Sequence, residues 1–228
     1  MQNPFELPED ESRLAGKGAL RRTDLYRDAW RERRTEFVRD HERDQGAVVW
    51  FGDSLTQGWG ELPKELFPGM HIANRGINSD TTRGMLYRVH EDVVKLRPRA
   101  VMLLMGTNDL KDEHSAADIA GNFKLIVDEI RGAQPEVPLV VCLVPPSSAS
   151  RGRSAERVQE LNRHYLEAVK GLPAVTVVDT FSLFATPSGE CDPVEFPDLL
   201  HPSDDAYRRF AEALRPVFAQ LGCLPARL

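Results

Sequence analysis

Short apolar segments alternate with longer segments of helical periodicity along most of the chain, and this alternation is what most constrains the fold. The apolar segments are rich in β-branched residues and apolar at successive positions, which is typical of strands covered on both faces of a parallel sheet. They lie at residues 47–51, 70–73, 100–105, 139–144 and 175–178. Helical patterns occupy residues 82–96, 116–131 and 154–170, with a shorter turn at 63–67. This order predicts an open α/β sheet with right-handed connections.

The two ends of the chain add further helices to this pattern. A final helix is expected to start near Ser203 or Asp204, and Pro216 should kink or interrupt it. Residues 1–20 are polar and predict an arm, whereas residues 23–43 are dense in charge and carry apolar residues on one helical face. A surface helix supported by i,i+4 ion pairs is the favoured interpretation, and an interaction helix is the alternative. We therefore expect an arm and a charged amphipathic helix over residues 1–46, packed on one domain over residues 47–228.

Charge and composition exclude several classes of protein. The net charge is −6 and the pI about 5.6, so the chain lacks the basic surface that binds nucleic acid or anionic membranes. No apolar segment approaches the length of a membrane span or a signal peptide, which predicts a cytoplasmic protein, although a removed signal peptide would leave the same sequence. The three cysteines are widely spaced and predict neither a disulfide framework nor a zinc site.

Polar residues follow several of the predicted strands, at the sheet edge where open parallel sheets bind their ligands. Gly52-Asp53-Ser54-Leu55 follows the first strand, Asn74-Arg75-Gly76 the second, and Gly106-Thr107-Asn108-Asp109 the third. Asp198-Leu199-Leu200-His201 comes beyond the fifth. The predicted topology therefore brings to one rim Ser54, Gly76, Asn108, Asp198 and His201.

These residue types together are those of an acyl-transfer site. A serine hydroxyl becomes a nucleophile when a base takes its proton, and His201 can do so because imidazole has an ordinary pKa of about 6.5. Asp198 can accept the Nδ1 proton of His201 and leave Nε2 facing Ser54. The backbone N–H groups of Ser54 and Gly76 and the side-chain amide of Asn108 are the natural donors to the oxyanion that forms.

These four segments resemble, in order and separation, the four sequence blocks of the GDSL/SGNH hydrolase family, over about residues 47–215. The resemblance implies a flavodoxin-like three-layer α/β/α fold, a sheet of order 2-1-3-4-5, and ester hydrolysis by an SGNH domain. Its named residues are Ser54, Gly76, Asn108 and His201, with Asp198 completing the triad. Asn74-Arg75-Gly76 before Asp80-Thr81-Thr82 is most similar to the branch with platelet-activating-factor acetylhydrolase catalytic subunits and bacterial acetylesterases. Relatives usually carry glycines where this chain has Asn78-Ser79, which predicts a stiffer or differently shaped loop.

Other polar residues of the rim are expected to brace it or to touch substrate. Asp53 and Asp109 are expected to brace the rim by bonding local backbone, and Asn74 to brace it or to touch substrate. Arg75 either projects toward an anionic or sugar-bearing substrate or pairs with Asp80, and the structural role is favoured. Arg151 lies in a polar loop, residues 145–153, which is either a specificity loop or simply mobile.

The sequence therefore predicts a serine esterase that forms an acyl-enzyme, prefers short acyl groups, acetyl above all, and takes a carbohydrate or other small polar alcohol. A lysophospholipid-like or platelet-activating-factor-like lipid ester is the second interpretation. An acyltransferase or a non-catalytic module that binds acylated sugars remain further alternatives. Neither a metal nor an organic cofactor is needed, and the family resemblance is compatible with a homodimer. Motifs for an α/β-hydrolase elbow, a dinucleotide site or a P-loop are lacking.

Overall fold

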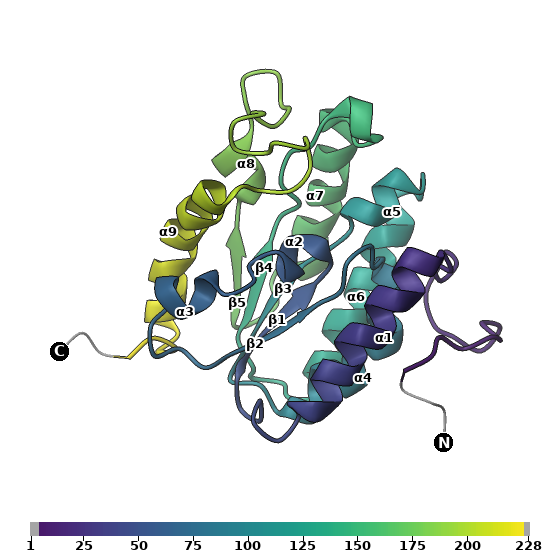
Figure 1. Ribbon diagram of the computed structural model, residues 1–228, viewed down its shortest axis with the longest axis vertical. Helices are drawn as coiled ribbons and strands as arrows, with labels where there is room; N and C mark the ends of the chain where they lie inside the picture. Colours follow the sequence, from purple (N-terminus) through teal and green to yellow (C-terminus); the bar gives the residue numbers. More distant parts are fainter. Residues whose placement is uncertain (1–4, 226–228) are drawn as a thin grey trace.

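A parallel sheet forms the centre of the protein in a computed structural model that describes residues 5–225 (Figure 1). Within these residues the sheet has five strands in the order β2-β1-β3-β4-β5, which confirms the predicted topology. The strands are β1 Val48–Gly52, β2 Ile72–Gly76, β3 Ala100–Leu104, β4 Leu139–Cys142 and β5 Val175–Val178. Every neighbouring pair is parallel, so the carboxyl ends of all five strands meet at one edge.

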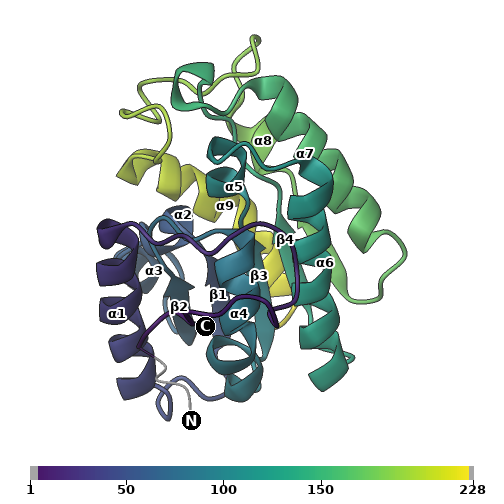
Figure 2. The same cartoon turned by 90° about the vertical axis from the view of Figure 1, so that its right-hand side faces the viewer.

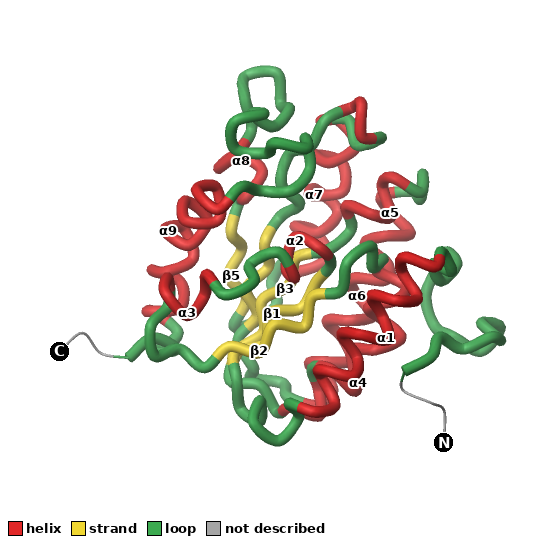
Figure 3. Tube along the Cα trace, viewed as in Figure 1, coloured by secondary structure: helices red, strands yellow, loops and turns green. Residues whose placement is uncertain are grey.

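Helices cover both faces of the sheet, which gives the predicted three layers (Figure 3). On one face lie α4 Thr82–Asp92, α6 Ala116–Ala133 and α7 Ala155–Val169, and on the other α3 Leu62–Leu66, α8 Thr180–Phe184 and α9 Asp204–Gln220. Side chains of β1 alternate between the two cores: Val49 and Phe51 pack toward α4, whereas Val48 and Trp50 pack toward α9. This two-sided burial explains why the sequences of β1, β3 and β4 are apolar throughout.

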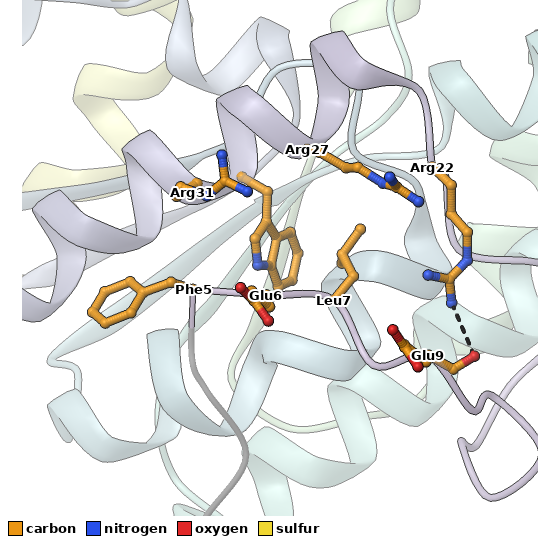
Figure 4. Close-up of a pocket in the computed structure, with 8 residues that line it drawn as sticks. Phe5, Glu6, Leu7, Glu9, Arg22, Arg27 and Arg31 are labelled. Atoms are coloured by element: carbon orange, nitrogen blue, oxygen red, sulfur yellow. Dashed lines mark hydrogen bonds between the residues drawn. The ribbon is translucent and has the colours of Figure 1, made fainter.

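The N-terminal segment packs on the edge of the sheet and over one helical layer. Helix α1 Asp24–Arg39 buries Tyr26, Trp30, Arg34 and Phe37 in a face that contacts the β2 side of the fold. The arm that precedes α1 crosses α4 toward α6 (Figure 2), where the Lys17 N–H donates to Asn122 Oδ1 at 2.7 Å. Close to its start, the arm encloses a small pocket against α1 (Figure 4).

Two predicted elements and the predicted effect of Pro216 differ most from the structure. Strand β2 starts and ends later than the predicted 70–73, because its register with β1 pairs Gly52 with Gly76 and thus draws Asn74 and Arg75 into the sheet. The predicted 82–96 helix is divided into α4 and a 3₁₀ turn, Val94–Leu96. Pro216 does not interrupt α9, which runs on to Gln220. Short helices directly after strands went unpredicted: α2 Ser54–Gln57, α5 Thr107–Lys111 and α8.

A buried ionic network connects α1 and α4 to the ends of β1 and β2. The Arg88 guanidinium pairs with Asp80 at 2.7 Å and with Asp92 at 3.1 Å, and Arg34 also pairs with Asp92. Arg88 donates in addition to the carbonyl oxygens of Gly52 and Arg75, each at 2.9 Å. The Arg88 side chain therefore connects Gly52, the last residue of β1, to two buried carboxylates.

We expect Arg88→Met to destabilise the fold by about 3–5 kcal/mol, because it leaves the buried Asp80 carboxylate without its cation and Asp92 with Arg34 alone. Urea unfolding followed by circular dichroism measures this change. Arg31→Met is the matched control: its pair with Asp28 is exposed, so a change within about 0.5 kcal/mol is expected. An equal loss in both variants would contradict a structural role for the network.

Candidate active site

Ser54 lies at the start of α2, immediately after β1, which pairs with β2 and β3. Asp53 caps this helix: its Oδ1 accepts a hydrogen bond from the Leu55 N–H at 2.9 Å. The turn requires glycine at position 52, because a Cβ there would lie 2.2 Å from the carbonyl oxygen of Leu104. The Ser54 side chain therefore projects beyond the carboxyl edge of the sheet, where the end of β1, Gly52 and the Asp53 cap position it.

His201 and Asp198 come from the loop before α9 and meet Ser54. His201 Nε2 lies 2.9 Å from Ser54 Oγ, and its Nδ1 lies 2.7 Å from Asp198 Oδ2. The other oxygen of Asp198 accepts from the N–H groups of Leu200 at 3.0 Å and His201 at 2.7 Å. Leu199 adopts a positive φ of 63°, which closes this turn. The side chains of Asp198, His201 and Ser54 therefore lie in a continuous row of hydrogen-bond contacts.

The pKa of Asp198 follows from these contacts. Burial would raise the pKa of this carboxyl, but the hydrogen bonds from the His201 N–H and the His201 side chain outweigh it and bring the pKa below its ordinary value. The carboxylate is therefore ionised at neutral pH and accepts the Nδ1 proton. That arrangement leaves Nε2 free to take the proton of Ser54.

Ser54 and His201 open into a cavity of about 540 Å³, lined also by Asn78, Ser79 and Asn108. Asn108 stands near the start of α5, after Gly106 with its positive φ of 104°. Its Nδ2 donates to the Asp80 carbonyl oxygen at 2.9 Å, and its Oδ1 accepts from Arg153 at 3.3 Å. Because an amide nitrogen carries two protons, Nδ2 retains one donor for the cavity.

Gly76 does not line this cavity, contrary to the expectation that its N–H faces the oxyanion. The Gly76 N–H donates to Asn74 Oδ1 at 2.9 Å, and the residue closes strand β2 opposite Gly52. A Cβ at position 76 would lie 2.2 Å from the Gln57 nitrogen, so glycine is needed here for packing. Since β2 extends through Gly76, the rim beyond it begins three residues later than the sequence predicts.

Asn78 and Ser79 occupy that rim position instead. Ser79 has a positive φ of 65°, a conformation that favours glycine. Within residues 5–225 the Asn78 N–H donates to Gln57 Oε1 at 2.6 Å, whereas the Ser79 N–H donates to no protein acceptor. Ser79 is therefore a backbone donor at the cavity that the sequence interpretation missed, although the departure from glycine at 78–79 marked the position.

The remaining predicted rim residues act as braces around the cavity. Asp109 accepts from the Thr82 N–H at 3.0 Å and from its hydroxyl at 2.6 Å. Asn74 donates to the Thr56 carbonyl oxygen at 2.8 Å. Burial raises the pKa of Asp53 to about 7, and the Leu55 N–H partly opposes this. Asp53 thus bonds the backbone of its own turn, whereas Asp109 bonds Thr82, which lies 27 positions earlier in the sequence.

Arg75 also has a structural role, but with a different partner from the one predicted. It pairs with Asp44 at 2.8 Å, and its guanidinium stacks 4.6 Å from the Phe37 ring centroid. Asp80 cannot be its partner because Arg88 and the Tyr26 hydroxyl already bind that carboxylate. Arg75 is thus buried beneath α1 and does not line the cavity.

Arginines from two distant segments complete the cavity. Arg151 ends a 3₁₀ turn, Ala149–Arg151, and lies 3.9 Å from Asp198. From the arm, Arg21 donates to the carbonyl oxygens of Ser79 at 2.9 Å and Asn108 at 3.3 Å while pairing with Asp112 at 2.7 Å. Arg21 thereby ties together the two loops that carry cavity donors. Arg21 was not predicted, and the buried Arg153 was predicted only as part of the 145–153 loop, because nothing local in the sequence distinguishes either residue from other loop arginines.

Residues 5–225 contain no group of three or more histidine, cysteine, aspartate or glutamate side chains placed to hold a metal ion. None of the helices in the same residues combines the length and the apolar character needed to cross a membrane.

Several known proteins resemble this chain in sequence or in fold. Human platelet-activating factor acetylhydrolase IB subunit alpha2 is 27% identical over 222 residues, which cover 96% of this chain and 92% of that protein. A GDSL-like lipase from Bacteroides thetaiotaomicron superimposes with a TM-score of 0.70 at 19% identity, over 81% of this chain and 97% of that one. An acetyl xylan esterase from Geobacillus stearothermophilus gives a TM-score of 0.59 at 18% identity, over 81% and 100%. The model of the GDSL-like Lipase/Acylhydrolase family matches residues 50–209, and the chain therefore belongs to this family of acylhydrolases, which act on carboxylic esters.

Proposed function

We propose that the protein is a serine esterase in which Ser54, His201 and Asp198 form the catalytic triad. The observation that carries the proposal is the unbroken row of contacts from Asp198 Oδ2 to His201 at 2.7 Å and from His201 to Ser54 Oγ at 2.9 Å. A nucleophile within hydrogen-bond distance of its base, with the base oriented by an acid, is the arrangement that acyl transfer requires.

The proposed reaction has two halves. Ser54 Oγ attacks the ester carbonyl carbon while His201 Nε2 takes the hydroxyl proton, and the tetrahedral intermediate then expels the alcohol as His201 returns that proton to the leaving oxygen. Water next attacks the carbonyl carbon of the acyl-enzyme while His201 takes one of the water protons. The second tetrahedral intermediate then expels Ser54 Oγ, which recovers that proton from His201, and the carboxylic acid is released. The alcohol half of the substrate therefore lies on the His201 side of the cavity.

Three donors are proposed for the oxyanion: the N–H of Ser54, the N–H of Ser79 and the Nδ2 of Asn108. This set replaces Gly76 with Ser79, because Ser79 lines the cavity and its N–H has no protein acceptor among residues 5–225. The Arg21 and Arg153 contacts fix the orientation of these donors before substrate arrives, which is what makes oxyanion stabilisation effective.

We expect Asn108→Ala to lower kcat by about 10²–10³ with little change in ground-state binding, because the amide acts on charge that develops in the transition state. Steady-state hydrolysis of p-nitrophenyl acetate measures kcat and KM separately. Asn162→Ala, which removes a buried asparagine bonded to the Val144 backbone outside the cavity, controls for loss of folding. A rise in KM at constant kcat would argue against an oxyanion role for Asn108.

The proposed substrates are acetyl esters of carbohydrates or other small polar alcohols. Support comes from the polar side chains that line much of the cavity, Asn78, Ser79, Asn108, Ser150 and Arg151 among them, and from similarity to an acetyl xylan esterase. A lipid ester is the second candidate, favoured by Leu25 and Leu200 in the same lining and by similarity to platelet-activating factor acetylhydrolase subunits.

A series of p-nitrophenyl esters from acetate to octanoate tests the acyl preference. We expect kcat/KM to fall with each added pair of methylenes beyond butyrate, because the described cavity offers few apolar side chains to bury a longer chain. Because every ester in the series releases p-nitrophenolate, all of the rates can be compared by absorbance at one wavelength. A kcat/KM that climbs toward octanoate would instead identify a lipid esterase.

A further inference from the structure

Basic side chains gather on one side of the catalytic cavity, although the chain as a whole carries a net charge of −6. Lys111, Arg151 and Arg153 form this side, here called the basic wall, and Arg21 from the arm lines the same cavity. Gly152 brings the wall together: a Cβ at position 152 would lie 3.9 Å from the Lys111 Cα. No aspartate or glutamate among residues 5–225 lines the cavity.

Arg153 is the buried member of the wall, and only 2% of its surface is exposed. Its guanidinium donates to the carbonyl oxygens of Thr107 and Arg151, each at 2.7 Å, and to the side-chain oxygen of Asn108 at 3.3 Å. All of these acceptors are neutral. A buried guanidinium is normally paired with a carboxylate or phosphate, because burying an uncompensated charge is costly.

The charges around Arg153 leave it only partly compensated. Burial lowers the pKa of Arg153 to about 10, Asp53 opposes this change, and the neighbouring cations Arg151 and Arg21 add to it. Asp53 is a weak counterion, since its own burial raises its pKa to about 7. The local potential is therefore positive at a site that opens to the substrate.

Lys111 and Arg151 extend this potential to the cavity mouth. Within residues 5–225, Lys111 makes no ion pair, and Arg151 lies 3.9 Å from Asp198, a carboxylate already bound to His201. Asp112, which follows Lys111, is held by Arg21 at 2.7 Å. Lys111 therefore has no carboxylate partner among residues 5–225, and Arg151 shares Asp198 with His201.

We propose that the basic wall binds an anionic group, a carboxylate or a phosphate, on the alcohol half of the ester substrate. The proposal rests on the esterase function above and assigns the charge of its substrate. The alcohol half is chosen because its oxygen takes the proton from His201, and Arg151 reaches the acid that orients His201. Arg153 donates to the side chain of Asn108, a proposed oxyanion donor, so an anion bound at the basic wall would lie close to the reacting carbonyl group.

Four acetyl esters with similar leaving groups test this proposal: 3-acetoxybenzoate, 3-acetoxyphenyl phosphate, the neutral methyl 3-acetoxybenzoate and the cationic 3-acetoxyphenyl-trimethylammonium. Their affinities are measured by calorimetry on the Ser54→Ala variant, so that binding is read without turnover. We expect each anion to bind at least about tenfold more tightly than the neutral ester, and the cation to bind most weakly. The tighter of the two anions identifies carboxylate or phosphate as the natural group.

Charge deletions locate the effect. In the Ser54→Ala background, Lys111→Gln with Arg151→Gln should reduce the anion-to-neutral affinity ratio to within about twofold of one. Lys124→Gln with Lys170→Gln removes the same charge from exposed helix sites and should preserve the ratio. Equal affinity for anionic and neutral esters, or a ratio that the Lys111 and Arg151 changes leave intact, overturns the proposal.

Hydrolysis of the neutral ester by the unmodified enzyme keeps the two proposals apart. If the neutral ester is cleaved and the anions bind no better, the basic wall has been misinterpreted and the esterase stands. If the anions bind as expected but the unmodified enzyme cleaves none of the four esters, the anion site stands and the proposed esterase function is wrong.

Discussion

Ser54→Ala is expected to lower kcat for p-nitrophenyl acetate by a factor on the order of 10⁶, since the whole triad acts through this one hydroxyl. Without Oγ there is no acyl-enzyme, and His201 has no proton to accept. The methyl group that remains is smaller than the hydroxymethyl group, so neither the α2 turn nor its Asp53 cap is disturbed. Residual hydrolysis should match the contribution of the oxyanion donors alone.

Stopped-flow and steady-state absorbance measurements, with circular dichroism to confirm folding, are sufficient for this test. Ser188→Ala is the matched control, because that serine is exposed, bonds only Thr186, and lies outside the cavity. A fluorophosphonate should label the unmodified protein once and the Ser54→Ala variant not at all. Activity that survives in Ser54→Ala would assign the nucleophile to another residue.

Asp198→Asn should reduce kcat by about 10⁴ while leaving the fold intact. The asparagine oxygen can still accept from the N–H groups of Leu200 and His201, so the turn is kept. Its NH₂ group, however, would face His201 Nδ1 and force the imidazole proton onto Nε2, where it blocks transfer from Ser54. The expected loss of kcat therefore comes from the wrong tautomer of His201, because the position of the imidazole is unchanged.

Asp192→Asn provides the matched comparison, because it makes the same chemical change in the same loop at a residue whose side chain bonds the Val194 N–H. Less than threefold change in kcat is expected there, by the same reasoning that makes surface substitutions nearly neutral. If Asp198→Asn costs less than tenfold, another carboxylate must orient His201.

Much of the fold and the core of the site could be predicted because their determinants are local. A buried parallel strand is apolar at successive positions, and the Asp198 to His201 spacing is that of a single turn whose acid bonds its own loop. Ser54 follows a strand directly, so knowing the strand was sufficient to place the serine at the rim. The family resemblance rested on these same segments.

Gly76 was predicted as an oxyanion donor because the sequence placed the end of the second strand too early. Asn74 and Arg75 look like loop residues in the sequence, yet both lie in β2, where Asn74 bonds the Thr56 carbonyl and Arg75 pairs with Asp44. Only tertiary partners make a polar strand favourable there, and none of those partners is near in sequence. The same reason hid Arg153, whose importance depends on neutral acceptors from a different loop.

Arg21 has a consequence for how this enzyme can be shortened. The side chain reaches Ser79 across 58 positions and Asn108 across 87, so a segment that precedes every strand of the sheet helps to shape the transition-state pocket. A truncated version that starts at α1 would keep nucleophile, base and acid in full. It would nevertheless leave the carbonyls of both donor loops without their common anchor, and the minimal hydrolytic unit therefore begins ahead of the first helix and not at the first strand.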